Sequence, residues 1–150
     1  DYADGVYRFI LKNIKNEDKA SDIVQDAFVK MWDKVETINS EKARSYLFTA
    51  AYHTMIDYVR KEKRMVDSDE DHSDILTSEN QYNDLNDVLH EALEKLPEIQ
   101  RSVVLLRDYE GYSYEEIGEI TRLNESQVKV YIYRARRALK KYIGSLDRVL

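Results

Sequence analysis

Two capping boxes lie eleven residues apart near the end of the chain, and together they restrict this region to very few folds. Ser113 is followed three residues later by Glu116, and Asn124 is followed three residues later by Gln127. In a capping box the two side chains each accept a hydrogen bond from the other residue's backbone N–H at a helix start. The spacing leaves room for one short helix, ending near Thr121, and a turn of about three residues before the next helix begins. This pattern predicts a helix-turn-helix.

The second helix of this motif separates its apolar residues from its polar and charged ones. Helical spacing predicts a buried stripe of Val128, Ile132, Ala135, Leu139 and Tyr142. The other faces present Ser126, Gln127, Lys129, Val130, Tyr133, Arg134, Arg137, Lys140 and Lys141. The second helix of a helix-turn-helix enters the major groove, where lysine and arginine neutralise phosphates. We therefore predict DNA binding by this face, with a merely solvated charged face as the alternative.

The rest of the chain also has the apolar periodicity of helices. Only four glycines and one proline occur in 150 residues, and apolar side chains recur at i, i+3, i+4 and i+7, so we predict an all-α fold. In the clearest case, 16–35, the apolar face is expected to include Phe28, Met31 and Trp32. Further helices are predicted near 6–14, from about 41 to 64 with Asn39 or Ser40 as N-cap, over 85–96, and from Pro97 to a stop at Gly111.

Charge divides the chain into two helical units. The net charge is -6, yet residues 65–94 contain ten acids and no lysine or arginine, so both flanks are slightly basic. The segment 65–84 has mutually repelling carboxylates and few apolar residues, which favours a solvated linker. We predict an N-terminal helical bundle over 1–64, an acidic linker over 65–84, and a C-terminal helix-turn-helix domain over 85–150.

Several classes of protein are disfavoured by what the sequence lacks. Without cysteine, the chain can form neither a disulfide nor a cysteine-bound metal site. The histidines His53, His72 and His90 are scattered, and no Gly-rich phosphate loop is present, so we expect no catalysis, no cofactor and no metal. No apolar run approaches the roughly 18 residues of a membrane span, and the start lacks the order of a signal peptide. We expect no membrane insertion and a cytoplasmic location.

Two parts of the sequence resemble a known protein family. The stretch EALEKLPEIQRSVVLLRDYEGYSYEEIGEITRLNESQVKVYIYRARRAL resembles the C-terminal, -35-reading domain of the group IV (extracytoplasmic-function, ECF) RNA polymerase sigma factors of the sigma-70 family. The stretches ASDIVQDAFVKMW and ARSYLFTAAYHTMIDYVRKEKR resemble their N-terminal, -10-reading domain. The resemblance covers nearly the whole chain except the acidic linker. It implies a sigma region 2 type bundle followed by a sigma region 4 type helix-turn-helix.

The resemblance implies roles for residues of the N-terminal unit. Asp22, Gln25 and Asp26 would contact the clamp helices of the polymerase's largest subunit, with a solvated polar face as the alternative. In the third helix aromatic residues alternate with cations, which suits melted DNA because bases stack on rings. The residues assigned to the -10 element are Asn39, Tyr52, His53, Asp57, Arg60, Lys61 and Arg64. Core packing of the rings and an ion pair between Asp57 and Arg60 are the alternative interpretations.

In the C-terminal unit, the resemblance assigns the -35 element to the exposed face of the last helix. The assigned residues are Ser126, Gln127, Lys129, Val130, Tyr133, Arg134 and Arg137. The side chain of Gln127 suits bidentate pairing with an adenine. Three positions depart from the family pattern: Arg122 stands where a glycine is usual, Gly118 where alanine is favoured, and His53 where asparagine is more frequent. Glycine weakens a helix by about 1 kcal/mol relative to alanine, although it suits close helix crossing.

The resemblance implies a non-catalytic initiation factor. Such a protein binds core RNA polymerase, recognises promoter DNA and helps to open the -10 region, and an anti-sigma factor is a further expected partner. The acidic linker would follow a cationic path inside the polymerase, or would be a plain spacer. A conventional helix-turn-helix regulator with an N-terminal sensing or dimerisation unit is the alternative. The aromatic and basic third helix argues against that alternative, because a sensing unit does not need it.

Overall fold

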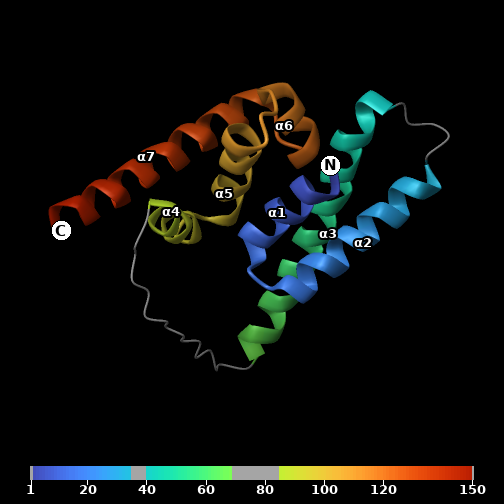
Figure 1. Cartoon of the computed structure of the whole chain (residues 1–150), viewed down its shortest axis with the longest axis horizontal. Helices are drawn as coiled ribbons and strands as arrows, with labels where there is room; N and C mark the ends of the chain where they lie inside the picture. Colours follow the sequence, from blue (N-terminus) through green and yellow to red (C-terminus); the bar gives the residue numbers. More distant parts are fainter. Residues whose placement is uncertain (1, 35–39, 69–84, 150) are drawn as a thin grey trace.

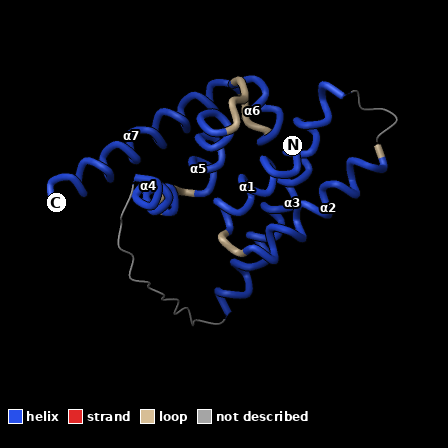
Figure 2. The backbone as a smooth tube through the Cα atoms, in the orientation of Figure 1, coloured by secondary structure: helices blue, strands red, loops and turns tan. Residues whose placement is uncertain are grey.

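The elements of the computed structural model are all helical (Figure 2), and the described residues are 2–34, 40–68 and 85–149. In chain order they are α1 (Tyr2–Ile14), α2 (Glu17–Asp33), α3 (Ser40–Ser68), α4 (Leu85–Glu94), α5 (Glu98–Val104), the π-helical turn η1 (Leu105–Tyr109), α6 (Tyr114–Thr121) and α7 (Glu125–Val149). The predicted all-α fold class is confirmed.

Helices α1, α2 and α3 pack as a bundle in the N-terminal half (Figure 1). Helix α2 begins after Asn16, whose side chain accepts a hydrogen bond from the N–H of Lys19 at 3.0 Å. The bundle buries the apolar stripes that periodicity indicates, namely Val6, Phe9, Ile10, Ala20, Ile23, Val24, Ala27, Leu47, Phe48, Ala51 and Met55. The prediction that Trp32 belongs to the apolar face is wrong. Its side chain is 73% exposed, because the buried face of α2 lies on the opposite side of the helix.

Both predicted capping boxes are present and they define the helix-turn-helix. Ser113 Oγ accepts from the N–H of Glu116 at 3.1 Å, and Glu116 Oε1 accepts from the N–H of Ser113 at 2.9 Å. The second box has the same two bonds between Asn124 and Gln127, at 2.8 and 3.0 Å. Helices α6 and α7 therefore begin at the expected positions, and the buried stripe of α7 is formed by Val128, Ile132 and Ala135.

The turn between α6 and α7 explains one departure from the family pattern, Gly118, and shows that the other, Arg122, occupies a strained position. Arg122 ends α6 in the left-handed conformation with φ 65°, which glycine adopts without strain and other residues adopt at a cost of about 1–2 kcal/mol. At Gly118, a Cβ atom would lie only 2.7 Å from the backbone oxygen of Leu123. Glycine is therefore needed inside α6, where the chain folds back closely, while an arginine takes the strained turn position.

The predicted helix from Pro97 to Gly111 is present over 98–109, and its last part is π-helical. Pro97 precedes α5 as its N-cap residue, and after Val104 the chain continues as the π-helical turn η1. Gly111 then has φ 79°, as expected of a residue just past a helix end. The N–H of Tyr112 reaches back to the carbonyl of Leu106 at 3.0 Å and closes this end.

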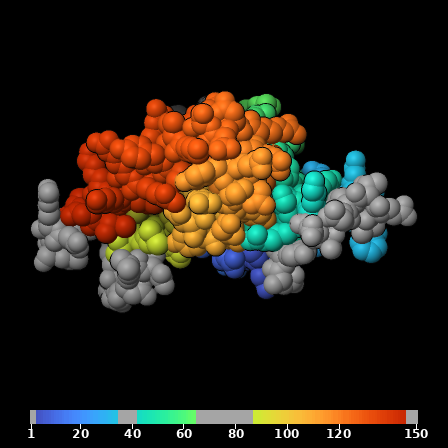
Figure 3. All heavy atoms as spheres, turned by 90° about the horizontal axis from the view of Figure 1, so that it is seen from above, coloured from blue at the N-terminus to red at the C-terminus, as the bar shows by residue number. Residues whose placement is uncertain are grey.

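The two halves of the chain pack directly on each other. Helix α3 lies against α6, and α1 lies against α5, so a single hydrophobic core runs from Val6 in α1 to Ala135 in α7. In the space-filling view of Figure 3 the C-terminal helices, in orange and red, adjoin the start of α3, in cyan. The ring of Phe48 links the halves. Its centroid lies 5.6 Å from that of Phe9 in α1 and 5.3 Å from that of Tyr112 in the C-terminal half.

Candidate nucleic-acid interface

The outward face of α7 displays the residues predicted to read DNA. Ser126, Gln127, Lys129, Val130, Tyr133, Arg134 and Arg137 are all exposed. A shallow groove of about 240 Å³ runs past the start of the helix and is lined by Asn124, Ser126, Gln127, Val130, Tyr131 and Arg134. This end of the second helix is the part that approaches base edges when such a helix occupies a major groove.

Two cations of α7 have acidic neighbours. Lys129 Nζ lies 3.3 Å from Glu125, one turn earlier in the same helix. Arg136 makes two bonds to the carboxylate of Asp108, with Nε at 3.0 Å and Nη2 at 2.5 Å from its oxygens. Arg136 therefore joins α7 to η1, and its guanidinium is already occupied. A second groove, of about 870 Å³, has Arg137, Lys140 and Lys141 among its lining residues.

The side chain of Gln127 is already engaged at one atom. Its Oε1 accepts the hydrogen bond from the N–H of Asn124 that completes the second capping box. A bidentate contact with adenine uses both the amide oxygen and the amide nitrogen, so the oxygen would have to serve the cap and the base together. The cap fixes the side chain at the start of α7.

The outer face of α2 carries the residues predicted to bind the polymerase. Asp22, Gln25 and Asp26 are all exposed there, and Gln25 Nε2 donates to Ser21 Oγ at 3.4 Å. Two large apolar side chains lie exposed on the same face: Val29, as expected for the outer face of this helix, at 62%, and Trp32, which was predicted to lie on the buried face, at 73%. The spacing of Trp32 relative to Gln25, seven residues, could have indicated a shared face. An exposed tryptophan beside polar groups is typical of a binding surface.

The residues of α3 predicted to bind the -10 element fall into two groups. Asp57, Arg60, Lys61 and Arg64 are exposed towards the end of the helix, and among the described residues no ion pair joins Asp57 to Arg60. Tyr52 is buried, with only 4% of its surface exposed. His53 is half-buried. Asn39 lies outside the described residues.

The surroundings of Tyr52 and His53 include groups from the C-terminal half. Burial, followed by the nearby carboxylate of Glu98, raises the pKa of Tyr52 above its ordinary range. Burial, followed by the cation of Arg122, lowers the pKa of His53. The two rings contact each other edge to face, 5.3 Å apart, and His53 Nε2 is buried without a hydrogen-bond partner in the described part of the chain. Charged groups of the C-terminal half are therefore close enough to influence the titration of both side chains.

The described residues form neither a metal-binding cluster nor a membrane-spanning helix. Within 2–34, 40–68 and 85–149, no group of three or more His, Cys, Asp or Glu side chains is arranged to hold a metal ion. In the same ranges no helix is both long and apolar enough to cross a membrane.

Known proteins with similar sequence and structure share this two-part organisation. The family model "Sigma-70 region 2" matches residues 1–65, and "Sigma-70, region 4" matches residues 86–139. The chain is 36% identical over 150 residues to the RNA polymerase sigma factor SigV of Bacillus subtilis (strain 168), covering 98% of this chain and 89% of that protein. It is 28% identical over 144 residues to the ECF RNA polymerase sigma factor SigM of the same organism, covering 93% of this chain and 88% of that protein.

A solved structure has a similar fold over most of the chain. The sigma factor RpoE from Bartonella quintana, crystallised with the anti-sigma factor NepR, superposes with a TM-score of 0.79 at 25% sequence identity. The superposition covers 95% of this chain and 92% of that chain. The arrangement of α1 to α7 is therefore one that a sigma factor adopts.

Proposed function

The chain belongs to the extracytoplasmic-function sigma factors of the sigma-70 family, and we propose that it binds core RNA polymerase and directs it to promoters. The observation that carries this proposal is a pair of exposed surfaces on opposite halves of the molecule. The outer face of α2 offers Gln25, Asp26 and Trp32 to a protein partner, while the start of α7 offers Gln127 and Arg134 to DNA. The protein itself carries out no chemical step.

The polymerase surface combines acidic and apolar groups. Asp22, Gln25 and Asp26 supply charge and hydrogen bonds, while Val29 and Trp32 supply apolar area on the same face. Tryptophan is enriched among the residues that dominate binding energy at protein interfaces. We assign the polymerase contact to all five side chains.

The DNA surfaces differ in the form of DNA they suit. The start of α7 is shaped for base edges in a duplex major groove, and its later cations, such as Arg137, suit phosphates. The end of α3, with Asp57, Arg60, Lys61 and Arg64 exposed, suits the melted -10 strand. We assign these functions to domains over 1–64 and 85–150, joined by the acidic linker 65–84.

Two further assignments follow from membership of the family. The protein acts in the bacterial cytoplasm, where polymerase and chromosome are located. An anti-sigma factor is its expected regulator, because the similar sigma factor RpoE was co-crystallised with the anti-sigma factor NepR.

The test is transcription by purified bacterial core polymerase on genomic DNA of the source organism, with and without this protein, with RNA 5′ ends mapped. We expect new starts that share two upstream elements separated by a constant spacer. If the protein binds DNA but gives core polymerase no new starts, the conventional helix-turn-helix regulator becomes the better account.

A further inference from the structure

A groove of about 290 Å³ lies where α1 meets α4, away from the residues assigned to polymerase and to DNA. Its α1 wall consists of Arg8, Leu11, Lys12 and Lys15, and its α4 wall of His90, Leu93 and Glu94. Residues spaced by three and four share one face of a helix, so each wall is a single helix face. The α1 wall rises about 10 Å from Arg8 to Lys15. This α1–α4 groove is therefore elongated, and its volume is near the lower end of those that small-molecule sites have.

Most of the surface inside the α1–α4 groove is apolar. Leu93 is buried and Leu11 is half-buried, and the methylene chains of the lysines and the arginine add apolar surface to the α1 wall. A ligand that consists only of a charged group, such as inorganic phosphate, would leave this surface in contact with water. The groove therefore favours a ligand that also has an apolar body.

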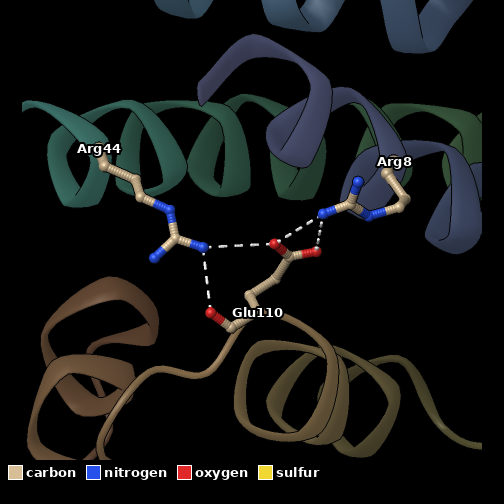
Figure 4. A network of polar contacts seen from close by, with 3 residues as sticks. All are labelled: Arg8, Arg44 and Glu110. Atoms are coloured by element: carbon tan, nitrogen blue, oxygen red, sulfur yellow. Dashed lines mark hydrogen bonds and ion pairs between the residues drawn. The ribbon is translucent and has the colours of Figure 1, made fainter. Parts of the chain in front are cut away.

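At one end of the groove, Arg8 has N–H groups that remain available. Its Nη2 donates to the carboxylate of Glu110, at 3.1 Å to Oε1 and 3.3 Å to Oε2 (Figure 4). Nη2 of Arg44 donates to the same Oε1 at 3.4 Å and to the backbone carbonyl of Glu110 at 3.0 Å. A guanidinium carries five N–H donors, and only Nη2 of Arg8 is engaged within the described residues. One acid thus serves two arginines.

Lys12, one turn further along α1, has a tyrosine ring but no acid as its neighbour. Its Nζ lies 4.0 Å from the ring centre of Tyr109, and no ion pair of Lys12 is formed in the described part of the chain. The side chain is half-buried. Burial, followed by the cation of Arg8, lowers its pKa, and Glu110 partly offsets this. Because charges removed from water are usually paired, this ammonium group would be stabilised by an anion.

The opposite end of the groove is electrically balanced. Lys15 Nζ pairs with Oε1 of Glu94 at 2.7 Å. The positive charge that lacks an acidic partner is therefore concentrated near Arg8 and Lys12, and apolar surface lies between that end and the ion pair. This arrangement is complementary to a molecule with one negative charge at the end of an apolar body.

We propose that the α1–α4 groove is a binding site for a small amphipathic carboxylate, such as a medium-chain fatty acid. The carboxylate accepts hydrogen bonds from Lys12 and Arg8, and the apolar body lies along Leu11 and Leu93. A single negative charge matches the single ammonium group that lacks an acid. The inference is independent of the proposed function, because it uses none of the residues assigned to polymerase or to DNA.

The test measures binding of octanoate to the full chain by isothermal titration calorimetry. We expect one saturable site with a dissociation constant below about 1 mM, as for a ligand of about ten non-hydrogen atoms. Acetate keeps the charge without the apolar body, and octylamine keeps the body with the opposite charge. Both should bind at least about tenfold more weakly than octanoate. Octanoate should also raise the midpoint of thermal unfolding, because it binds the folded chain.

Substitutions at Lys12 test the charged end of the groove. Lys12→Met keeps an unbranched side chain but removes the charge, so it should weaken octanoate binding about tenfold or more. Lys12→Gln should do the same and covers the case in which the methionine variant does not fold. Lys12→Arg keeps the charge and should retain most of the affinity. Lys19→Met is the matched control, because Lys19 also lies over a tyrosine ring, 5.7 Å from that of Tyr58, and it should bind octanoate as the wild type does.

Methyl resonances of labelled leucines locate the ligand. Those of Leu11 and Leu93 should shift on addition of octanoate, while those of Leu139 on α7, which does not line the groove, should not. Three results would overturn the proposal: no saturable binding of octanoate, equal affinity of wild type and both uncharged Lys12 variants, or equal affinity for octanoate and octylamine. None of these measurements uses polymerase or a promoter, so the outcome of the transcription test does not decide them.

Discussion

The two helices that we propose to face DNA present their assigned residues in opposite ways. On α7, Gln127, Tyr133 and Arg134 are exposed, and the helix is fixed from behind by its buried stripe. On α3, Tyr52 is buried and His53 is half-buried. The proposed duplex-binding surface is thus exposed as a whole, whereas part of the proposed strand-binding surface is buried. The difference teaches that assignment to a DNA-binding helix does not by itself place a side chain at the surface.

The largest expected effect is on the free energy of unfolding, which should respond differently to a substitution in α3 and to one in α7. Phe48 of α3 is fully buried between Phe9 and Tyr112, so Phe48→Ala should lower the free energy of unfolding by about 3–5 kcal/mol. Tyr133 of α7 is 63% exposed, and Tyr133→Ala should change it by no more than about 0.5 kcal/mol. Urea denaturation measures both. Equal losses in the two variants would contradict the buried position of Phe48.

The next effect concerns the proposed polymerase surface on the outer face of α2, which is exposed. Gln25→Ala combined with Asp26→Ala should weaken binding to core polymerase about tenfold to a hundredfold, since a few side chains dominate such interfaces. Glu17→Ala, an exposed acid elsewhere on α2, serves as the control. Unaltered affinity of the double variant in a titration with labelled protein would contradict the assignment of this face.

From the geometry of the turn that connects α6 to α7, we predict two changes in the free energy of unfolding that have opposite signs. Gly118→Ala should lower the free energy of unfolding by about 1–3 kcal/mol, because its Cβ would lie 2.7 Å from the oxygen of Leu123. Arg122→Gly should raise it by about 1 kcal/mol, because φ at this position is 65°. Thermal unfolding of the two variants checks the signs. A stabilising Gly118→Ala would mean that the turn differs from the one described.

On the exposed face of α7, removal of one cation should affect recognition. Arg134→Ala should weaken binding to duplex -35 DNA about tenfold and reduce discrimination among its single-base variants. Lys141→Ala, later on the helix, should weaken binding to all sequences alike, as expected of a phosphate contact. The duplexes would be taken from the mapped promoters. Equal discrimination in the two variants would remove Arg134 from base reading.

The smallest expected effect is a pH dependence of the contact between the two halves, which arises from His53. The pKa of His53 is lowered by burial and by Arg122, with Lys30 acting in the same sense, while the backbone of Ile120 and Asp57 partly oppose it. The closed form, in which the halves are packed together, therefore binds fewer protons than the open form, in which they are apart. As the pH falls below the ordinary value of 6.5, the equilibrium should move towards opening, by at most about tenfold per pH unit.

His53→Gln provides the control for this pH dependence. The variant removes the titrating ring and should show a smaller response to acid, even though burial also raises the pKa of Glu98 and so favours the closed form at low pH. Scattering measurements between pH 7.5 and 5.5, on the order of one unit either side of the ordinary histidine pKa, compare the two proteins. An identical response in wild type and His53→Gln would exclude His53 as its origin.

Local features could be predicted from the sequence, and long-range ones could not. The capping boxes at Ser113 and Asn124 depend on hydrogen bonds between residues three apart, and the stripe of α7 depends on helical spacing, so both follow from the sequence. The contact between Arg8 and Glu110 joins residues 102 positions apart, and no periodicity indicates it. Burial of Tyr52 and exposure of Trp32 likewise depend on which helices meet.

In the candidate site, too, local features could be predicted from the sequence and long-range ones could not. Exposure of Arg134 on α7 follows from local spacing, while the covering of His53 on α3 results from docking of the two halves. The π-helical turn η1 also falls outside pattern reasoning, since Leu105 to Tyr109 have ordinary helical composition. That turn places Glu110 between its arginines.

The central claim, that the two halves of the protein pack on each other, is tested most directly by a distance between them. The chain has no cysteine, so Lys63→Cys on α3 and Ser145→Cys on α7, both at exposed positions, can carry a donor and an acceptor dye. The account predicts efficient energy transfer in the free protein. Low transfer in the free protein would contradict it.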